Sequence, residues 1–135
     1  MKKVEVPEVL MKRIERDITI LLAEDEVIIF LYLKLLVEGL HFHILQAKNG
    51  QQAIDMCKNH PEIDVVLMDI KMPIMDGYSA AKEIKPGRPN LPIIAQTSYA
   101  LESERQKYSG RAFNDFISKP IDGKVLIQKI RKLVA

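Results

Sequence analysis

VVLMDIKMPIMDG, residues 65–77, decides the fold class of this chain. It opens with a continuous apolar run, rich in β-branched valine, that predicts a buried strand over residues 64–68. A strand that is apolar on both faces is typical of a parallel sheet covered by helices on both sides. Asp69 follows the run directly, and a proline and a glycine then interrupt regular structure. The stretch therefore predicts a strand, a loop and a helix, with a carboxylate where the strand ends.

The same unit recurs on both sides of that stretch. Short apolar runs alternate with segments of helical periodicity, which predicts a doubly wound α/β domain with a five-stranded parallel sheet and helices on both faces. Residues 1–17 form a leader with partly helical spacing, ahead of one domain at residues 18–135. We expect strands at residues 18–23, 43–47, 64–68, 92–95 and 115–118, and helices at residues 26–40, 51–59, 78–85, 101–111 and 124–134.

Composition excludes several classes of protein. The chain has 135 residues, of which 47% are hydrophobic, and this suits one domain with one core. Its net charge is +2, with basic and acidic residues interleaved, so no direct nucleic-acid binding is expected. The most apolar stretch, residues 27–37, is too short to span a bilayer. One cysteine, Cys57, fits a reducing compartment. We expect a cytoplasmic domain without direct membrane contact.

Polar side chains follow four of the predicted strands. Glu24 and Asp25 follow the first strand, Asp69 the third, Thr97 the fourth and Lys119 the fifth. Because the carboxyl ends of parallel strands meet at one edge, these groups are expected in one crevice. Crowded carboxylates repel each other unless a cation lies among them, and oxygen ligands without His or Cys favour Mg²⁺. A carboxylate can attack phosphorus to form an acyl phosphate, so the crevice is predicted to accept a phosphate.

Four motifs, in this order, resemble the receiver domains of bacterial response regulators and hybrid sensor kinases. The resemblance covers residues 17–134 and implies the flavodoxin-like strand order 2-1-3-4-5. It also implies a phosphoacceptor module of two-component systems rather than an enzyme that turns over. The motifs are LLAEDE at residues 21–26, VVLMDIKMPIMDG at residues 65–77, PIIAQT at residues 92–97 and FISKPI at residues 116–121.

The resemblance implies a metal and phosphoryl site built from the acidic motifs. Asp69 corresponds to the phosphorylated aspartate. Asp25 corresponds to a direct Mg²⁺ ligand, and Glu24 to one that acts largely through water. The backbone carbonyl of Lys71 corresponds to the third protein ligand.

The later motifs imply a switch. Thr97 corresponds to the hydroxyl that binds a phosphoryl oxygen, and Lys119 to the lysine that pairs with the phosphoryl group. The bond from Lys119 to Pro120 is implied to be cis. Phe116 occupies the aromatic switch position, where the ring is expected to swing inward when Thr97 moves. The phosphodonor implied by the family is a histidine kinase or a histidine phosphotransfer domain.

The predicted first helix is unusually apolar, because only three of residues 26–38 are charged. A second apolar stripe, beyond the one that faces the sheet, usually marks a contact surface. The partner on that surface is a histidine-containing phosphodonor, a neighbouring domain or a second copy, unless the leader folds over it. We expect Ile28, Tyr32, Leu36 and Leu40 to face the sheet, and Val27, Phe30, Leu31 and Leu35 to face outward.

Two other functions compete with the phosphoacceptor. A phosphatase with an aspartyl-phosphate intermediate commonly has a second aspartate two residues after the nucleophile, where this chain has Lys71. A receiver-like module that binds partners without phosphorylation would not need the full set of acids, hydroxyl and lysine. The sequence also leaves open whether the chain is a single-domain regulator or the receiver of a hybrid kinase.

Overall fold

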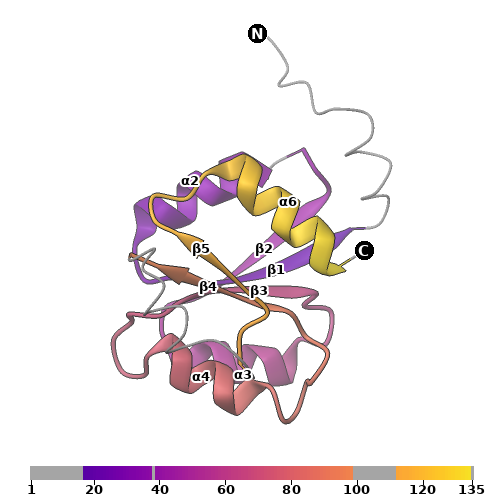
Figure 1. Ribbon diagram of the computed structural model, residues 1–135. Helices are drawn as coiled ribbons and strands as arrows, with labels where there is room; N and C mark the ends of the chain where they lie inside the picture. Colours follow the sequence, from indigo (N-terminus) through magenta and orange to yellow (C-terminus); the bar gives the residue numbers. More distant parts are fainter. Residues whose placement is uncertain (1–16, 38, 99–111, 135) are drawn as a thin grey trace, which may run out of the picture.

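The computed structural model describes residues 17–37, 39–98 and 112–134. Five parallel strands form one sheet in the order β2-β1-β3-β4-β5, which confirms the predicted order (Figure 1). Residues 1–16 of the predicted leader and the predicted helix at residues 101–111 lie outside the described residues. The strands are β1 (Ile18–Ala23), β2 (Phe42–Ala47), β3 (Val65–Asp69), β4 (Ile93–Thr97) and β5 (Asp115–Ser118). The helices are α2 (Val27–Val37), α3 (Gly50–Asn59), α4 (Gly77–Ile84) and α6 (Gly123–Val134).

The sheet is the middle layer of three. Helices α2 and α6 cover one face, and α3 and α4 cover the other (Figure 1). In β3, Val65 and Leu67 belong to the core beneath α2 and α6, whereas Val66 and Met68 belong to the core beneath α3 and α4. Alternate residues of a strand point to opposite faces, so a central strand of this fold needs apolar residues at every position. None of the described helices is long and apolar enough to cross a bilayer.

Two strands extend further than predicted. Asp69 is the last residue of β3, and Gln96 and Thr97 are the last residues of β4. The pairing continues through them, since Asp69 lies opposite Gln96 and Thr97 lies opposite Ser118. These polar residues are therefore fixed by the ladder, and do not stand on loops beyond it.

The orientation of α2 differs from the prediction. Leu33 and Val37 are its buried residues, and Phe30 is partly buried against the same core. Ile28 and Tyr32, predicted to face the sheet, are 80% and 47% exposed. The prediction was wrong for these two residues and for the outward placement of Phe30. A helix that is apolar on all sides gives no periodic signal that fixes which side packs.

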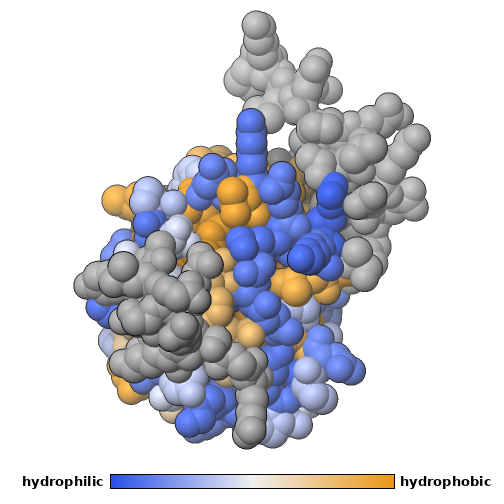
Figure 2. Space-filling model, viewed as in Figure 1, coloured by the Kyte–Doolittle hydropathy of each residue, from blue (hydrophilic) through white to orange (hydrophobic). Residues whose placement is uncertain are grey.

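An apolar surface does remain on α2, as predicted. Val27, Leu31 and Leu35 are exposed, and hydrophobic side chains are visible over α2 at the upper left of Figure 2. The helix ends earlier than expected, at Val37, where a turn follows with Gly39 at a φ of 89°. We define the α2 stripe as Val27, Ile28, Leu31, Tyr32 and Leu35.

Candidate functional site

The carboxyl edge of the sheet brings the predicted acids together. In the β1–β3 register Ala23 lies opposite Met68, so Glu24 and Asp69 come next at the same level. Carboxylate oxygens of Glu24, Asp25 and Asp69 all lie within 4.8 Å of one another. No other group of three such ligand residues occurs in the part of the chain that the structure describes. The predicted meeting of acids from the first and third strands is confirmed.

Lys119 supplies the positive charge at this edge. Its Nζ lies 3.1 Å from Asp69 Oδ2 and 3.8 Å from Glu24 Oε1. Its backbone N–H donates to Thr97 O, at 2.8 Å, which joins the residue after β5 to the end of β4. The bond between Lys119 and Pro120 is cis, as the resemblance implied. One ammonium thus lies beside two carboxylates that belong to different strands.

Glu24 is the most deeply buried of the three clustered acids. Its side chain is fully buried, and neither carboxylate oxygen has a hydrogen-bond partner within the described residues. Burial, and after it the neighbouring Asp69 carboxylate, raises the pKa of Glu24 to about 8. A carboxylate in this position becomes favourable when a cation lies close to its oxygens. The residues present therefore fit a divalent cation such as Mg²⁺.

The loop after β3 is built closely around Asp69. The backbone N–H of Lys71 donates to Asp69 Oδ1 at 3.2 Å. The N–H of Gly77 donates to Ile70 O at 2.8 Å, and a Cβ at Gly77 would lie 2.1 Å from Asp69 O. Only glycine permits this approach, so the motif's glycine is required by packing against the strand end. Asp76 caps α4 by accepting from Ser79 N at 2.8 Å.

The predicted switch residues, Thr97 and Phe116, lie on β4 and β5. Thr97 is buried at the end of β4. Phe116 is partly buried against the core beneath α3 and α4, and its ring centroid lies 5.7 Å from that of Phe113 in an edge-on arrangement. The structure thus brings together the acids and Lys119, with Thr97 at the end of β4 and Phe116 on the neighbouring strand.

Sequence reasoning gave no role to Gln96, which lies in the same place. Its side chain is completely buried, and neither amide atom has a hydrogen-bond partner within the described ranges. It pairs directly with Asp69 across the β3–β4 ladder. Its signal in the sequence is a polar residue that prolongs the otherwise apolar run of residues 92–95.

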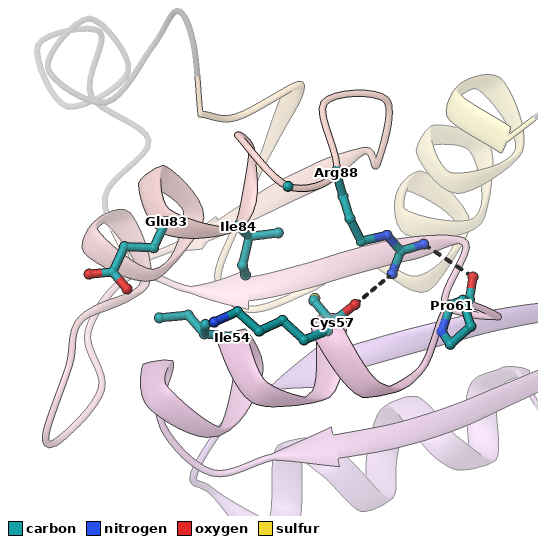
Figure 3. A pocket seen from close by; sticks show the side chains of 8 residues that line it. Ile54, Cys57, Pro61, Glu83, Ile84 and Arg88 are labelled. Atoms are coloured by element: carbon teal, nitrogen blue, oxygen red, sulfur yellow. Dashed lines mark hydrogen bonds between the residues drawn. The ribbon is translucent and has the colours of Figure 1, made fainter.

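A groove of about 390 Å³ lies elsewhere, between the carboxyl ends of α3 and α4 (Figure 3). Arg88 reaches from the loop after α4 to the end of α3, where it donates to Cys57 O at 3.3 Å and to Pro61 O at 3.2 Å (Figure 3). It also donates to Ile63 O, in the segment before β3, at 2.7 Å. Burial raises the pKa of the Cys57 thiol in its wall to about 11, which disfavours the reactive thiolate. Cys57 is therefore not poised to act as a nucleophile.

Comparisons with known proteins agree with this geometry. The family model of the response regulator receiver domain matches residues 20–131. Hybrid signal transduction histidine kinase M of Dictyostelium discoideum is 36% identical over 121 residues, which cover 85% of this chain but only 5% of that protein. The chain thus corresponds to a small part of that relative's length.

Solved structures show the same fold. The receiver domain of a Pseudomonas aeruginosa sensor histidine kinase, described with a magnesium ion in its active-site cleft, is 28% identical with a TM-score of 0.79, covering 87% of this chain and 98% of that one. A Saccharomyces cerevisiae structure joins the receiver domain of the response regulator Ssk1 to the histidine phosphotransfer protein Ypd1. The match is 25% identical with a TM-score of 0.81, covering 88% and 90% of the two chains. By its motifs, its strand order and these relatives, the chain belongs to the response regulator receiver domain family.

Proposed function

We propose that this receiver domain accepts a phosphoryl group on Asp69 from a phosphohistidine of a histidine kinase or a histidine phosphotransfer domain. A carboxylate oxygen of Asp69 attacks phosphorus, the phosphorus–nitrogen bond breaks, and its electron pair returns to the imidazole, which takes up a proton. The observation that carries the proposal is the 3.1 Å contact between Lys119 Nζ and Asp69 Oδ2 inside a cluster of three carboxylates. The ammonium is then placed to neutralise charge on the arriving group.

The acidic cluster supports a role for Mg²⁺. Asp25, Asp69 and the backbone carbonyl of Lys71 would hold the ion, with Glu24 acting through water. Bound there, Mg²⁺ would supply charge neutralisation to the phosphoryl oxygens. The buried oxygens of Glu24, which have no hydrogen-bond partner among the described residues, support this assignment.

The switch rests on Thr97 and Phe116. Thr97 stands at the end of β4, beside the strand that carries Asp69. Its hydroxyl binds a phosphoryl oxygen, and the ring of Phe116 follows into the space that Thr97 leaves. Phe116 has no hydroxyl, so packing alone carries this part of the response.

The α2 stripe is the proposed docking surface for the phosphodonor. It begins at Val27, two residues after Asp25, so a partner seated on it can reach the acidic cluster. Four of its five side chains are aliphatic, with Ile28 80% exposed, and the hydroxyl of Tyr32 donates to Ile121 O at 3.3 Å. A histidine phosphotransfer protein is the partner of the structurally similar yeast receiver. A second copy or a neighbouring domain are the competing occupants.

Labelling tests the chemistry. The chain is incubated with acetyl phosphate and Mg²⁺, and phosphorylated protein is followed by intact mass. We expect one phosphoryl group per chain, lost in Asp69→Asn and on addition of EDTA. Multiple turnover of the donor would support the rival phosphatase instead. An unlabelled wild-type chain would support the rival binding module.

Substitution of the stripe tests the docking surface. Leu31→Glu and Leu35→Glu should slow transfer from a phosphorylated histidine phosphotransfer protein about tenfold or more, because each places a charge in an apolar contact. Labelling by acetyl phosphate should be unchanged. Val125→Glu, at an exposed apolar position on α6, is the matched control. Unaltered transfer in both stripe variants, together with loss of self-association in sedimentation, would assign the stripe to a second copy.

A further inference from the structure

Gln96 is a buried polar residue that the fold itself does not need. Its side chain is fully buried within β4, yet its amide nitrogen and oxygen have no hydrogen-bond partner in the described part of the chain. Burying an unpaired amide is unfavourable, and an apolar side chain of the same size would avoid that penalty. Such a residue in a native core calls for an explanation outside the core.

Its position links it to the phosphoryl site. Gln96 lies opposite Asp69 on one side and Ile117 on the other. Residues directly paired across a sheet project from the same face, so the side chains of Gln96 and Asp69 leave the sheet side by side. The backbone adds a second link, because Ile70 N donates to Gln96 O at 3.2 Å.

The lysine comes from the other side of the same residue. Lys119 follows β5, the strand beyond β4, and its backbone N–H donates to Thr97 O. Its Nζ nevertheless reaches Asp69 on β3 and approaches Glu24 after β1. The lysine side chain therefore crosses the level of β4 where Gln96 stands.

We propose that Gln96 is a positioning residue of the phosphoryl site, which takes over the contacts of Lys119 and Asp69 when the arriving phosphoryl group draws the ammonium away from the carboxylate. This inference rests on the function proposed above. A carboxamide offers one acceptor oxygen and two N–H donors, an ammonium has three donors, and a carboxylate has only acceptors. The Gln96 oxygen accepts from Lys119 and its NH₂ donates to Asp69 as the ammonium turns from Asp69 toward the phosphoryl oxygens. The carboxamide thereby replaces the contact that Asp69 loses.

The deciding variant is Gln96→Met, which removes both polar atoms at nearly constant volume. We expect its labelling by acetyl phosphate in Mg²⁺ to slow about tenfold or more, as for the loss of a hydrogen bond to a charged group. Its melting temperature should equal or exceed that of the wild type, because an unpaired buried amide is gone. Mg²⁺ affinity, measured by titration calorimetry, should not change, since Gln96 is not a proposed ligand.

Ile94→Val is the matched control, because Ile94 lies on the same face of β4 two residues earlier. It should lower the melting temperature and leave labelling unchanged. Wild-type labelling rates in Gln96→Met would overturn the proposal, and so would a fall in its melting temperature or a failure to fold, since the amide would then serve the core. An unlabelled wild-type chain would instead refute the proposed function.

Discussion

The two edges of the same sheet treat their polar groups in opposite ways. At the amino edge, Arg88 donates to the carbonyl oxygens of four residues, and Lys85 Nζ donates to Leu91 O and Asn114 Oδ1, each at 2.7 Å. At the carboxyl edge, Glu24 and Gln96 are buried with polar atoms that find no hydrogen-bond partner within the described residues. The same five strands form both edges, so the difference lies in the residues at the two ends of the strands and in the loops that follow them.

The amino edge serves stability, and the carboxyl edge serves chemistry. Hydrogen bonds that satisfy backbone carbonyls hold the loops of the amino edge closed around the core. Unpaired groups at the carboxyl edge leave the fold less stable than it could be, and natural proteins keep such violations mainly where a ligand or a reaction requires them.

Lys119→Met should remove function while leaving the chain folded. The loss of the ammonium beside Asp69 should lower the rate of labelling by acetyl phosphate about 100-fold or more, as for the loss of one preorganised charge-stabilising group. Intact-mass kinetics measure the rate, and circular dichroism checks the fold. Lys124→Met, at an exposed position on α6, is the control. Wild-type labelling in Lys119→Met would break the assignment of the carboxyl edge to chemistry.

Arg88→Met should lower stability while leaving function intact. It leaves backbone carbonyls around the end of α3 without their donor, so the free energy of unfolding should fall by about 2–4 kcal/mol. Labelling below the melting temperature should match the wild type. Urea denaturation gives the free energy, with Lys58→Met, in the wall of the same groove, as the control. A stability equal to that of the control would mean that the guanidinium contacts contribute nothing.

The raised pKa of Glu24 makes the stability of the chain depend on pH. Glu24 ionises near its usual value of 4.5 when unfolded but near 8 when folded, so the folded chain binds more protons between these values. The free energy of unfolding should therefore fall as pH rises from about 4.5 to about 8 and level off above that. Mg²⁺ should oppose the fall, and Glu24→Gln should remove its contribution. The prediction would be contradicted if, in EDTA, the free energies of unfolding of the wild type and of Glu24→Gln changed with pH in parallel.

The smallest effect concerns strain in the loop after β3. Ile74 has a φ of 69° and is 84% exposed, so a β-branched side chain occupies a left-handed conformation without packing in return. Ile74→Asn should raise the free energy of unfolding by about 0.5–1 kcal/mol, because Asn tolerates this region better. Ile74→Val keeps the branch and should show no gain. A less stable Asn variant would show that Ile74 makes a contact worth more than its strain.

Much of the site followed from the sequence because it depends on strand order and strand ends. An apolar run followed by Asp69 predicted where β3 would stop to within one residue, and parallel pairing then required Glu24 and Asp69 to meet. Lys119 was predicted at the same edge for the same reason, because it follows the carboxyl end of β5. The orientation of α2 did not follow, because its apolar residues surround the helix, and only contact with the sheet selects Leu33 and Val37.

Alternation and motif spacing by themselves determined the doubly wound fold, the edge where polar groups gather and the identity of the acids and the lysine. They could do so because residue period and chain direction are local properties. Only the tertiary structure decided that Glu24 is fully buried, that Gln96 stands level with Asp69 and that Ile28 and Tyr32 face outward. Burial and register depend on which surfaces pack together, and that is set by contacts between segments far apart in the chain.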